Sequence, residues 1–453
     1  MGDRATELEE IVGHHLEQAY RLRAELGPVG AGELALAKRS AEILSSAGRR
    51  AGLRSDMAAA INLLGRALEL GGEDLVDRPL LLRELSAALW ARGELGPSEQ
   101  ALSAALAAAL AVGDRRLEWY AQLDRSARRG STESDAEAEL ARVASEAVGV
   151  FDALGDDLGL ARAWRCLAQI ARRGCRFAEA QQAADQALAH AEAAGDTNEV
   201  AGIVDLLCTA LLYGPARADR ASARCAEIAT AAGGDRVLEA NAASSQAGLE
   251  AMLGNFDEAR RLVATAAATY DELGHRLYRA GLSEVAAPIE LLAGQPEAAE
   301  QELRHAFRIL AESGNTAMLG SPALMLVEPL LAQGRAEEAR HFAEIGKAAM
   351  SSDDVTDQIL ARTVDARLRV IEGYFAEAEA EARKAVQLAA GTDALVLHAD
   401  ALVLLGEVLA AERSPAAAEA RQQAAELYER KGNVVARRAA AEIAAAREHA
   451  PTG

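Results

Sequence analysis

The chain of 453 residues contains few aromatic side chains, since Phe, Trp and Tyr together make up 4% of it. Stretches in which β-branched or aromatic residues alternate with polar ones, the usual signature of a half-buried strand, are nearly absent. Hydrophobic residues still make up 50% of the chain, and alanine, the strongest helix former, dominates them. The composition argues against a β-rich fold and predicts an all-α protein that is too long for a single compact core.

Positive charge is also scarce. The chain has 48 Lys and Arg residues against 69 Asp and Glu residues, a net charge of −21, and only four of the 48 are lysines. Binding of nucleic acid requires a concentrated basic face that neutralises phosphates, and an acidic chain is repelled by a polyanion. We therefore expect no nucleic-acid contact by this region.

Targeting signals and long apolar runs are missing as well. The first ten residues, MGDRATELEE, are acidic, whereas a secretory signal begins with a basic segment. The longest alanine-rich apolar run covers residues 101–112 and is shorter than the roughly 20 residues that span a bilayer. The four cysteines form no C-x-x-C pair. These features predict a cytoplasmic protein with reduced cysteines and no membrane contact.

Signatures of catalysis and cofactor binding do not occur. A phosphate-binding loop reads G-x-x-x-x-G-K-[ST], but the single Gly-Lys pair, Gly346-Lys347, is followed by Ala348 and lacks the upstream glycine. Neither G-x-S-x-G nor H-E-x-x-H is present. We therefore predict no ATP site, no catalytic residues and no cofactor, and we expect that the chain is not an enzyme.

The adjacent histidines His14 and His15 raise the question of a metal site. Consecutive residues of a helix point about 100° apart, so the two rings cannot face one ion from the same turn. His14 can share a face with Glu17 or Gln18, but two or three loosely placed ligands are weak support for a metal. The pair is interpreted as an interhelical contact, and no metal is expected.

What the sequence does contain is an internal repeat. GNFDEA at residues 254–259 recurs as GYFAEA at 373–378 and, with one extra residue, as GCRFAEA at 174–180. Alignment on the aromatic position gives ten anchor positions with a period of about 40 residues: Met57, Leu95, Ala136, Phe177, Ala216, Phe256, Pro296, Ala336, Phe375 and Pro415. A regular period of this length is typical of stacked helical repeats.

A second signal has the same period and falls between the anchors. It is a glycine followed by Asp, His or Asn, at positions 113–114, 155–156, 195–196, 234–235, 274–275, 314–315 and 432–433. Glycine suits the left-handed position after a helix, and Asp or Asn caps the next one. Each period is thus predicted to be two helices joined by short turns, and such units stack into a solenoid in which each repeat contacts its neighbours.

The repeat resembles the tetratricopeptide repeat. In the best copy, residues 161–180, the packing positions are occupied by Trp164, Leu167, Ala168, Phe177 and Ala180. The period here exceeds the usual one of about 34 residues, so the helices are expected to be longer. Trp164 could also stack on a ligand, but its place in the repeat favours a packing role.

The period divides the chain into three predicted segments. Residues 1–52 form a helical linker or capping region, residues 53–445 a right-handed tetratricopeptide-like superhelix of about ten helix pairs, and residues 446–453 a disordered tail. Pro288 and Pro329 fall inside predicted first helices of two successive repeats. We expect a kink at each, or else a tolerated bend, because proline removes one N–H and clashes with the carbonyl four residues earlier.

The segment ELEEIVGHHLEQAYRLRAELGP closely resembles one found in large actinobacterial ATP-binding regulators. Residues 54–70, 155–174 and 426–439 add to this resemblance in the same order. Those regulators combine a nucleotide-cyclase-like or winged-helix output region, a signal-transduction ATPase of the AAA/STAND type and a long C-terminal repeat region. The resemblance implies that this chain is such a C-terminal sensor or scaffold, separate from the ATPase and its catalytic residues.

Counting back from the anchors places side chains on the concave face of the superhelix. These positions, with the neighbouring Arg125, give the candidate binding residues Arg125, Arg128, Arg162, Arg165, Gln169, Arg172, Asn241, Ser244, Glu284 and Glu328. The arginines predict a groove for an acidic peptide, or for an acidic segment of an ATPase or output domain of the same polypeptide. The alternative is that they pair with acidic residues of neighbouring helices.

Three functions follow as hypotheses. The first is a non-enzymatic protein-interaction or sensor module of a bacterial signal-transduction ATPase or transcriptional regulator, which binds a partner protein or peptide. The second is a receptor for a small-molecule inducer, with a pocket between repeats. The third, an α-helical enzyme, lacks a nucleophile–base pair, a metal constellation or a cofactor loop. A thermal-shift screen against metabolites distinguishes the first two, and substrate turnover would support the third.

Overall fold

A computed structural model shows that the regular secondary structure of the described residues is entirely helical, without a strand among them. The chain divides into two compact units, residues 1–159 and 160–453, which are described separately. The all-α fold class is confirmed. The structure describes residues 2–53, 56–73, 75, 77–92, 94–132, 137–312, 318–350 and 354–448.

The first unit is a run of antiparallel helices, each packed against the next along the chain. Its core is lined by small and branched apolar residues, among which Leu44, Leu81 and Leu102 are fully buried. Its helices are α1 (Gly2–Leu26), α2 (Ala31–Leu53), α3 (Met57–Gly71), α4 (Arg78–Ala91), α5 (Leu95–Val112), α6 (Arg115–Thr132) and α7 (Glu137–Leu154).

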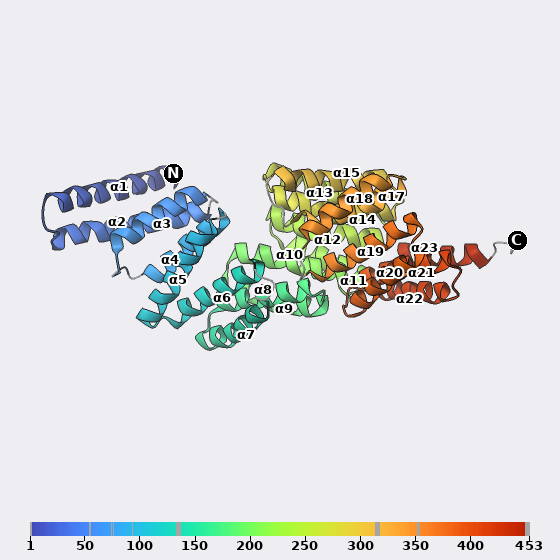
Figure 1. Ribbon diagram of the computed structural model, residues 1–453. Coiled ribbons are helices and arrows are strands. Elements are labelled where there is room, and N and C mark those ends of the chain that lie inside the picture. Colours follow the sequence, from blue (N-terminus) through green and yellow to red (C-terminus); the bar gives the residue numbers. More distant parts are fainter. Residues whose placement is uncertain are drawn as a thin grey trace. The chain divides into compact units, whose positions relative to one another are not determined.

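The second unit continues the same alternation of helices and short turns (Figure 1). Its first helix, α8 (Asp157–Arg173), begins just before the boundary between the units. The others are α9 (Phe177–Ala194), α10 (Thr197–Tyr213), α11 (Ala218–Ala231), α12 (Arg236–Met252), α13 (Phe256–Glu272), α14 (Arg276–Leu292), α15 (Pro296–Glu312), α16 (Gly320–Met325), α17 (Val327–Ala332), α18 (Ala336–Ala349), α19 (Val355–Glu372), α20 (Phe375–Ala390), α21 (Leu395–Ala411), α22 (Ala416–Lys431) and α23 (Val434–Glu448).

The repeat read from the sequence matches the observed helices. Most anchors are the first residue of the second helix of a pair, as at Phe177, Phe256 and Phe375. The anchor at Ala216 lies two residues before the start of α11. The anchor Ala136 and the Gly314-Asn315 pair of the second signal lie outside the described residues. The predicted glycines Gly113, Gly155, Gly195, Gly234, Gly274 and Gly432 all have positive φ. The helix-pair prediction is therefore confirmed.

With one exception, the residues after these glycines cap the next helix as expected. The Asp196 side chain accepts a hydrogen bond from the Glu199 N–H, and the Asn433 side chain accepts one from the Ala436 N–H. His275 makes no such cap. A side-chain oxygen at this position satisfies an N–H that has no partner within the helix.

The aromatic anchors pack inside the repeats. Phe177 is buried, and Trp164 lies partly buried against a core of alanine, leucine and cysteine side chains. Alanine at the helix contacts, including Ala184, Ala187 and Ala191, lets neighbouring helices approach closely. The packing role predicted for these aromatic residues is confirmed. The four cysteines are free, as expected, and all four are buried.

The two internal prolines act differently. Helix α14 continues without interruption through Pro288. Before Pro329, by contrast, the helix is interrupted at Leu326, so that α16 and α17 are separate short helices. The break follows Met325, whose carbonyl would normally accept a hydrogen bond from residue 329, and proline has no N–H to donate.

The last repeats of the second unit contact its first repeats. Helix α21 packs on α10, and α23 packs on α12. Asp393, in the turn before α21, accepts hydrogen bonds of 2.7 Å from the backbone N–H groups of both Phe177 and Ala178. A carboxylate at the N-terminus of α9 accepts hydrogen bonds from N–H groups that have no partner within the helix. Its negative charge also interacts favourably with the positive end of the helix dipole. Stability in this unit is therefore not carried by neighbouring repeats alone.

Lys431 makes the complementary contact at the other end of a helix. Its side chain is fully buried, and its Nζ donates hydrogen bonds to the carbonyls of Leu211 at 3.0 Å and Gly214 at 2.8 Å, where α10 ends. The Leu211 carbonyl would ordinarily accept from residue 215, but this is a proline and has no N–H. Lys431 supplies the missing donor. We refer to the Asp393 and Lys431 interactions as the closure contacts.

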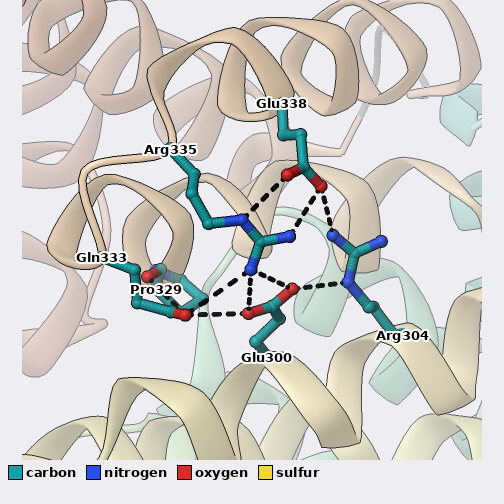
Figure 2. A network of polar contacts seen from close by, with 6 residues as sticks. All are labelled: Glu300, Arg304, Pro329, Gln333, Arg335 and Glu338. Carbon is teal, nitrogen blue, oxygen red and sulfur yellow. Dashed lines mark hydrogen bonds and ion pairs between the residues drawn. The ribbon is translucent and has the colours of Figure 1, made fainter.

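A polar network around the buried Glu300 joins α15 to the following repeat (Figure 2). Glu300 accepts hydrogen bonds from Arg304 at 2.6 Å, Gln333 at 2.8 Å and Arg335 at 2.7 Å. Both arginines also bond to Glu338, each at 2.7 Å. Burial alone would raise the pKa of Glu300, but these hydrogen bonds outweigh burial and lower it. The network ties α15 to α18 through two carboxylates and two guanidinium groups.

Candidate functional site

Two of the arginines predicted to bind a ligand are already paired. On α8, Arg162 Nε lies 2.8 Å from Glu199 Oε1, and Arg165 Nε lies 3.0 Å from Glu199 Oε2. Glu199 belongs to the first turn of α10 and is buried. The two guanidinium groups thus share one carboxylate of the adjacent repeat. Arg162 and Arg165 therefore follow the alternative prediction, in which the arginines pair with acidic residues of neighbouring helices.

The two candidates of the first unit are also engaged. Arg125 on α6 forms an exposed ion pair with Glu99 on α5 at 3.2 Å. Arg128 donates a hydrogen bond to the Ser98 hydroxyl at 2.9 Å and another to the Ser86 hydroxyl, and its guanidinium lies 5.4 Å from the ring centroid of Trp90. Burial lowers the pKa of Arg128. Both side chains hold neighbouring helices together.

The remaining polar candidates are spread over the second unit. Asn241 is buried and accepts a hydrogen bond of 2.7 Å from the Tyr270 hydroxyl, so it is not on the accessible surface. Gln169 and Ser244 are half-buried. Glu328 is exposed and lies 3.4 Å from Arg367 on α19. These four residues form no common constellation.

Arg172 and Glu284, by contrast, are close enough to affect each other electrostatically. Burial raises the pKa of Glu284 to about 7, and the positive charge of Arg172 opposes this rise. Burial also raises the pKa of Asp205 on α10, again opposed by Arg172. Asp354 and Asp357, at the start of α19, raise the pKa of Glu284 further. Arg172 on α8 therefore acts electrostatically on carboxyl groups of both α10 and α14, and Glu284 on α14 also senses the carboxylates at the start of α19.

The pairing of these charges is incomplete. Asp357 accepts a hydrogen bond from the Ser321 hydroxyl, and Asp354 caps α19. The carboxylates of Asp205 and Glu284 and the guanidinium of Arg172 make no hydrogen bond or ion pair with any residue that the structure describes. A partly desolvated carboxylate without a partner is unfavourable for folding and is a common feature of binding sites.

Two tyrosines flank these charges. The pKa of Tyr213, at the end of α10, is raised by burial and by Glu284, and that of Tyr278 on α14 is raised by burial and by Asp205. Their side chains nevertheless remain 37% and 39% exposed. Aromatic faces beside carboxylates are a favourable environment for an organic cation. We name Arg172, Asp205, Tyr213, Tyr278 and Glu284 the Glu284 cluster.

Sequence reasoning found only Arg172 and Glu284 of this cluster. Asp205 could have been noticed, because it is the single charged residue in the apolar stretch of residues 200–213. Tyr213 and Tyr278 carry no such signal. They lie outside the positions obtained by counting back from the anchors.

Of the two opening histidines, His14 makes the interhelical contact that was expected of the pair. His14 Nδ1 on α1 lies 3.3 Å from Arg66 Nη2 on α3, and Arg66 also bonds to the buried Glu17. Within the described residues, no group of three or more His, Cys, Asp or Glu side chains is placed to hold a metal. In the same part of the chain, no helix combines the length and apolarity needed to cross a membrane.

Comparison with known proteins finds similarity at the level of the fold. No protein-family model and no curated protein sequence matches the chain. The structure of the human IFIT1 dimer with m7Gppp-AAAA is similar at 13% identity and a TM-score of 0.51, covering 99% of this chain and 96% of that one. The Cut9–Hcn1 hetero-tetramer of the APC/C is 13% identical with a TM-score of 0.48, covering 93% and 87%. Apo RapI is 12% identical with a TM-score of 0.40, covering 68% and 97%.

These neighbours are tetratricopeptide-like helical-repeat proteins. At such identities the likeness shows the fold alone. The resemblance to actinobacterial ATP-binding regulators stays a prediction. This chain has a tetratricopeptide-like α-solenoid fold.

Proposed function

We propose that the chain is a non-enzymatic protein-interaction module, and that its second unit binds a partner segment carrying lysine or arginine at the Glu284 cluster. The observation that carries this proposal is the pair of desolvated, unpartnered carboxylates, Asp205 and Glu284. A cation placed beside these carboxylates would recover electrostatic energy that their burial costs.

The sign of the ligand's charge follows from the residues that surround the cluster. Asp354 and Asp357 add negative charge around Glu284, and the guanidinium of Arg172 opposes the rise in the pKa of both Asp205 and Glu284. Such a field attracts cations and repels anions. The acidic ligand expected from the sequence is therefore not proposed for this cluster, since Arg162 and Arg165 already share Glu199.

The wider role that we propose is the sensor or scaffold region of a bacterial signal-transduction ATPase or transcriptional regulator. Support comes from the resemblance of four sequence segments to such regulators and from the solenoid fold. In that setting the partner is a separate protein or a basic segment of the same polypeptide. An organic cation, and not a metal, fits the cluster, because its carboxylates are flanked by tyrosines.

Selection from a phage-displayed library of random peptides tests this function without knowledge of the partner. We expect the full chain to enrich peptides that carry Lys or Arg. A D205N/E284Q double variant should bind the selected peptides at least about tenfold more weakly, since one desolvated charge–charge contact is worth about 1.5–3 kcal/mol. The control is Glu258→Gln, an exposed carboxylate paired with Arg261, which should bind as the wild type does.

The same selection distinguishes a basic ligand from an acidic ligand and from the absence of peptide binding. Enrichment of acidic peptides whose binding is lost on Arg172→Gln would support the ligand expected from the sequence and contradict ours. The absence of any enriched peptide would contradict a peptide-binding function. Circular dichroism of each variant verifies that helicity is retained.

A further inference from the structure

A pocket of about 440 Å³ lies at the turn between α10 and α11. Gln181 of α9 forms one side, Leu211 and Pro215 contribute apolar surface, and Arg217, Arg220 and Arg224 contribute positive charge. This volume is within the range of small-molecule pockets, about 300–1,000 Å³. None of the residues that line it is acidic.

The three arginines converge because of their spacing. Arg217 immediately precedes α11, and positions 217, 220 and 224 follow the three- and four-residue steps that place side chains on one face of a helix. A planar guanidinium presents paired donors that match the oxygens of a phosphate or carboxylate. The row of arginines therefore offers several such donors to one ligand.

The guanidinium groups of these arginines can exchange their present partners for a ligand. The Arg220 side chain makes no hydrogen bond or ion pair with any described residue. Arg217 pairs with Asp219, and Arg224 pairs with Glu227, each at 3.3 Å and with both partners largely exposed. Exposed pairs of this kind contribute at most about 1 kcal/mol. Asp185 on α9 also interacts with Arg224, so the net positive charge is greatest around Arg217 and Arg220.

We propose that this pocket binds a small molecule through a phosphate group, held by Arg217 and Arg220 with Arg224 at the rim. This is a second site, opposite in charge to the Glu284 cluster and independent of the function proposed for it. The pocket also adjoins the closure contacts. The Leu211 carbonyl accepts from Lys431, and a Cβ placed on Gly432 would lie 3.5 Å from Arg217 Nη2.

Isothermal titration calorimetry of the full chain with inorganic pyrophosphate tests the site. We expect saturable binding to the wild type at about 100 mM salt, where long-range charge effects are screened beyond about 10 Å. Arg220→Gln should weaken binding about tenfold, and the R217Q/R220Q/R224Q variant should abolish it. Arg261→Gln, an exposed arginine of the same unit that is paired with Glu258, should leave binding unchanged.

Several results would overturn the proposal. They are the absence of saturable pyrophosphate binding to the wild type, equal binding by the triple variant, and equal weakening by Arg261→Gln. Saturable binding of citrate without binding of pyrophosphate would also overturn it, because the site would then select carboxylates. Thermal unfolding followed with and without pyrophosphate gives a second readout, since a bound ligand raises the melting temperature of the folded chain.

Discussion

Replacing Lys431 with alanine is expected to destabilise the second unit by about 3–4 kcal/mol. The substitution removes buried methylenes worth about 0.8 kcal/mol each and leaves the Leu211 and Gly214 carbonyls without their donor, at about 1–3 kcal/mol for an unsatisfied buried group. Relief from burying an amine offsets part of this loss. Trp164 is the single tryptophan after residue 159, so its fluorescence during urea unfolding, in a W90F/W119F background, reports on this unit.

The pH dependence of stability gives this prediction a second, independent readout. Burial lowers the pKa of Lys431 from 10.5 to about 7. Between these values the unfolded chain binds more protons than the folded chain, so the Lys431 contribution to stability rises with pH above about 7. A neutral amine still donates two hydrogen bonds. Relative to Lys431→Met, the wild type should therefore gain stability between pH 7 and pH 9.

A matched control separates the closure contact from the loss of a lysine. Lys384 on α20 is 53% exposed and pairs with Glu381, so Lys384→Ala should change the unfolding free energy by no more than about 0.5 kcal/mol. An equal effect of the two alanine variants would show that Lys431 does not hold the first and last repeats together.

Glu300→Ala is expected to lower the stability of the second unit by about 2–3 kcal/mol. Removal of one partner from a buried charge network leaves the others uncompensated, which costs about 3–5 kcal/mol when burial is complete. Here Arg304 and Arg335 are 35% and 36% exposed, which reduces the effect. Urea unfolding followed by Trp164 fluorescence measures the change, with Glu258→Ala as the exposed control.

The network also predicts a response to acid. The pKa of Glu300 is held below its ordinary value of 4.5, so its contribution is present above about pH 4.5 and is lost as the pH falls below it. The difference between wild type and Glu300→Ala should therefore shrink below pH 4.5. A difference that stays constant down to pH 3 would contradict the assignment of its stabilising role to the ionised carboxylate.

The local part of the fold was predictable because its signals are local. A left-handed glycine, a capping residue and an apolar anchor recur every 40 residues or so, and they specify where each helix begins and ends. The anchor at Ala216 was misplaced by two residues, because α11 starts only after Pro215 and the turn that follows it. Proline at 329 likewise marked a real interruption of the helix.

The closure contacts were not predictable in this way. Asp393 caps a helix that starts 216 residues earlier in the chain, and no periodic signal connects the two positions. Lys431 offered a hint, as one of only four lysines in the chain. Its burial depends on how far the superhelix turns, which is a sum of small rotations between repeats and is not encoded in any one of them.

For the candidate binding residues, too, the position along each helix was predictable and the contacts between repeats were not. Counting from the anchors placed Arg162, Arg165 and Arg172 on one helix face, but it did not reveal that Glu199 of the next repeat neutralises the first two. Nor did it show that Asp205 and Glu284 lack partners. Pairing depends on side-chain geometry between repeats, which the period alone leaves open.

The central claim is that the Glu284 carboxylate attracts a cationic side chain of a partner. Fluorescence anisotropy of a labelled, histidine-free basic peptide from the library selection tests it most directly, with affinities measured at pH 6, 7 and 8. The charges of Lys and Arg do not change over this range. With a pKa of about 7, the ionised fraction of Glu284 rises about tenfold from pH 6 to pH 8.

We therefore predict that the wild type binds the peptide up to about tenfold more tightly at pH 8 than at pH 6, and that Glu284→Gln loses most of this dependence while retaining its helicity. D205N/E284Q, which also lacks the Glu284 carboxylate, should lose the same dependence. An affinity that does not vary with pH in the wild type, or that varies equally in the wild type and in Glu284→Gln, would contradict the account.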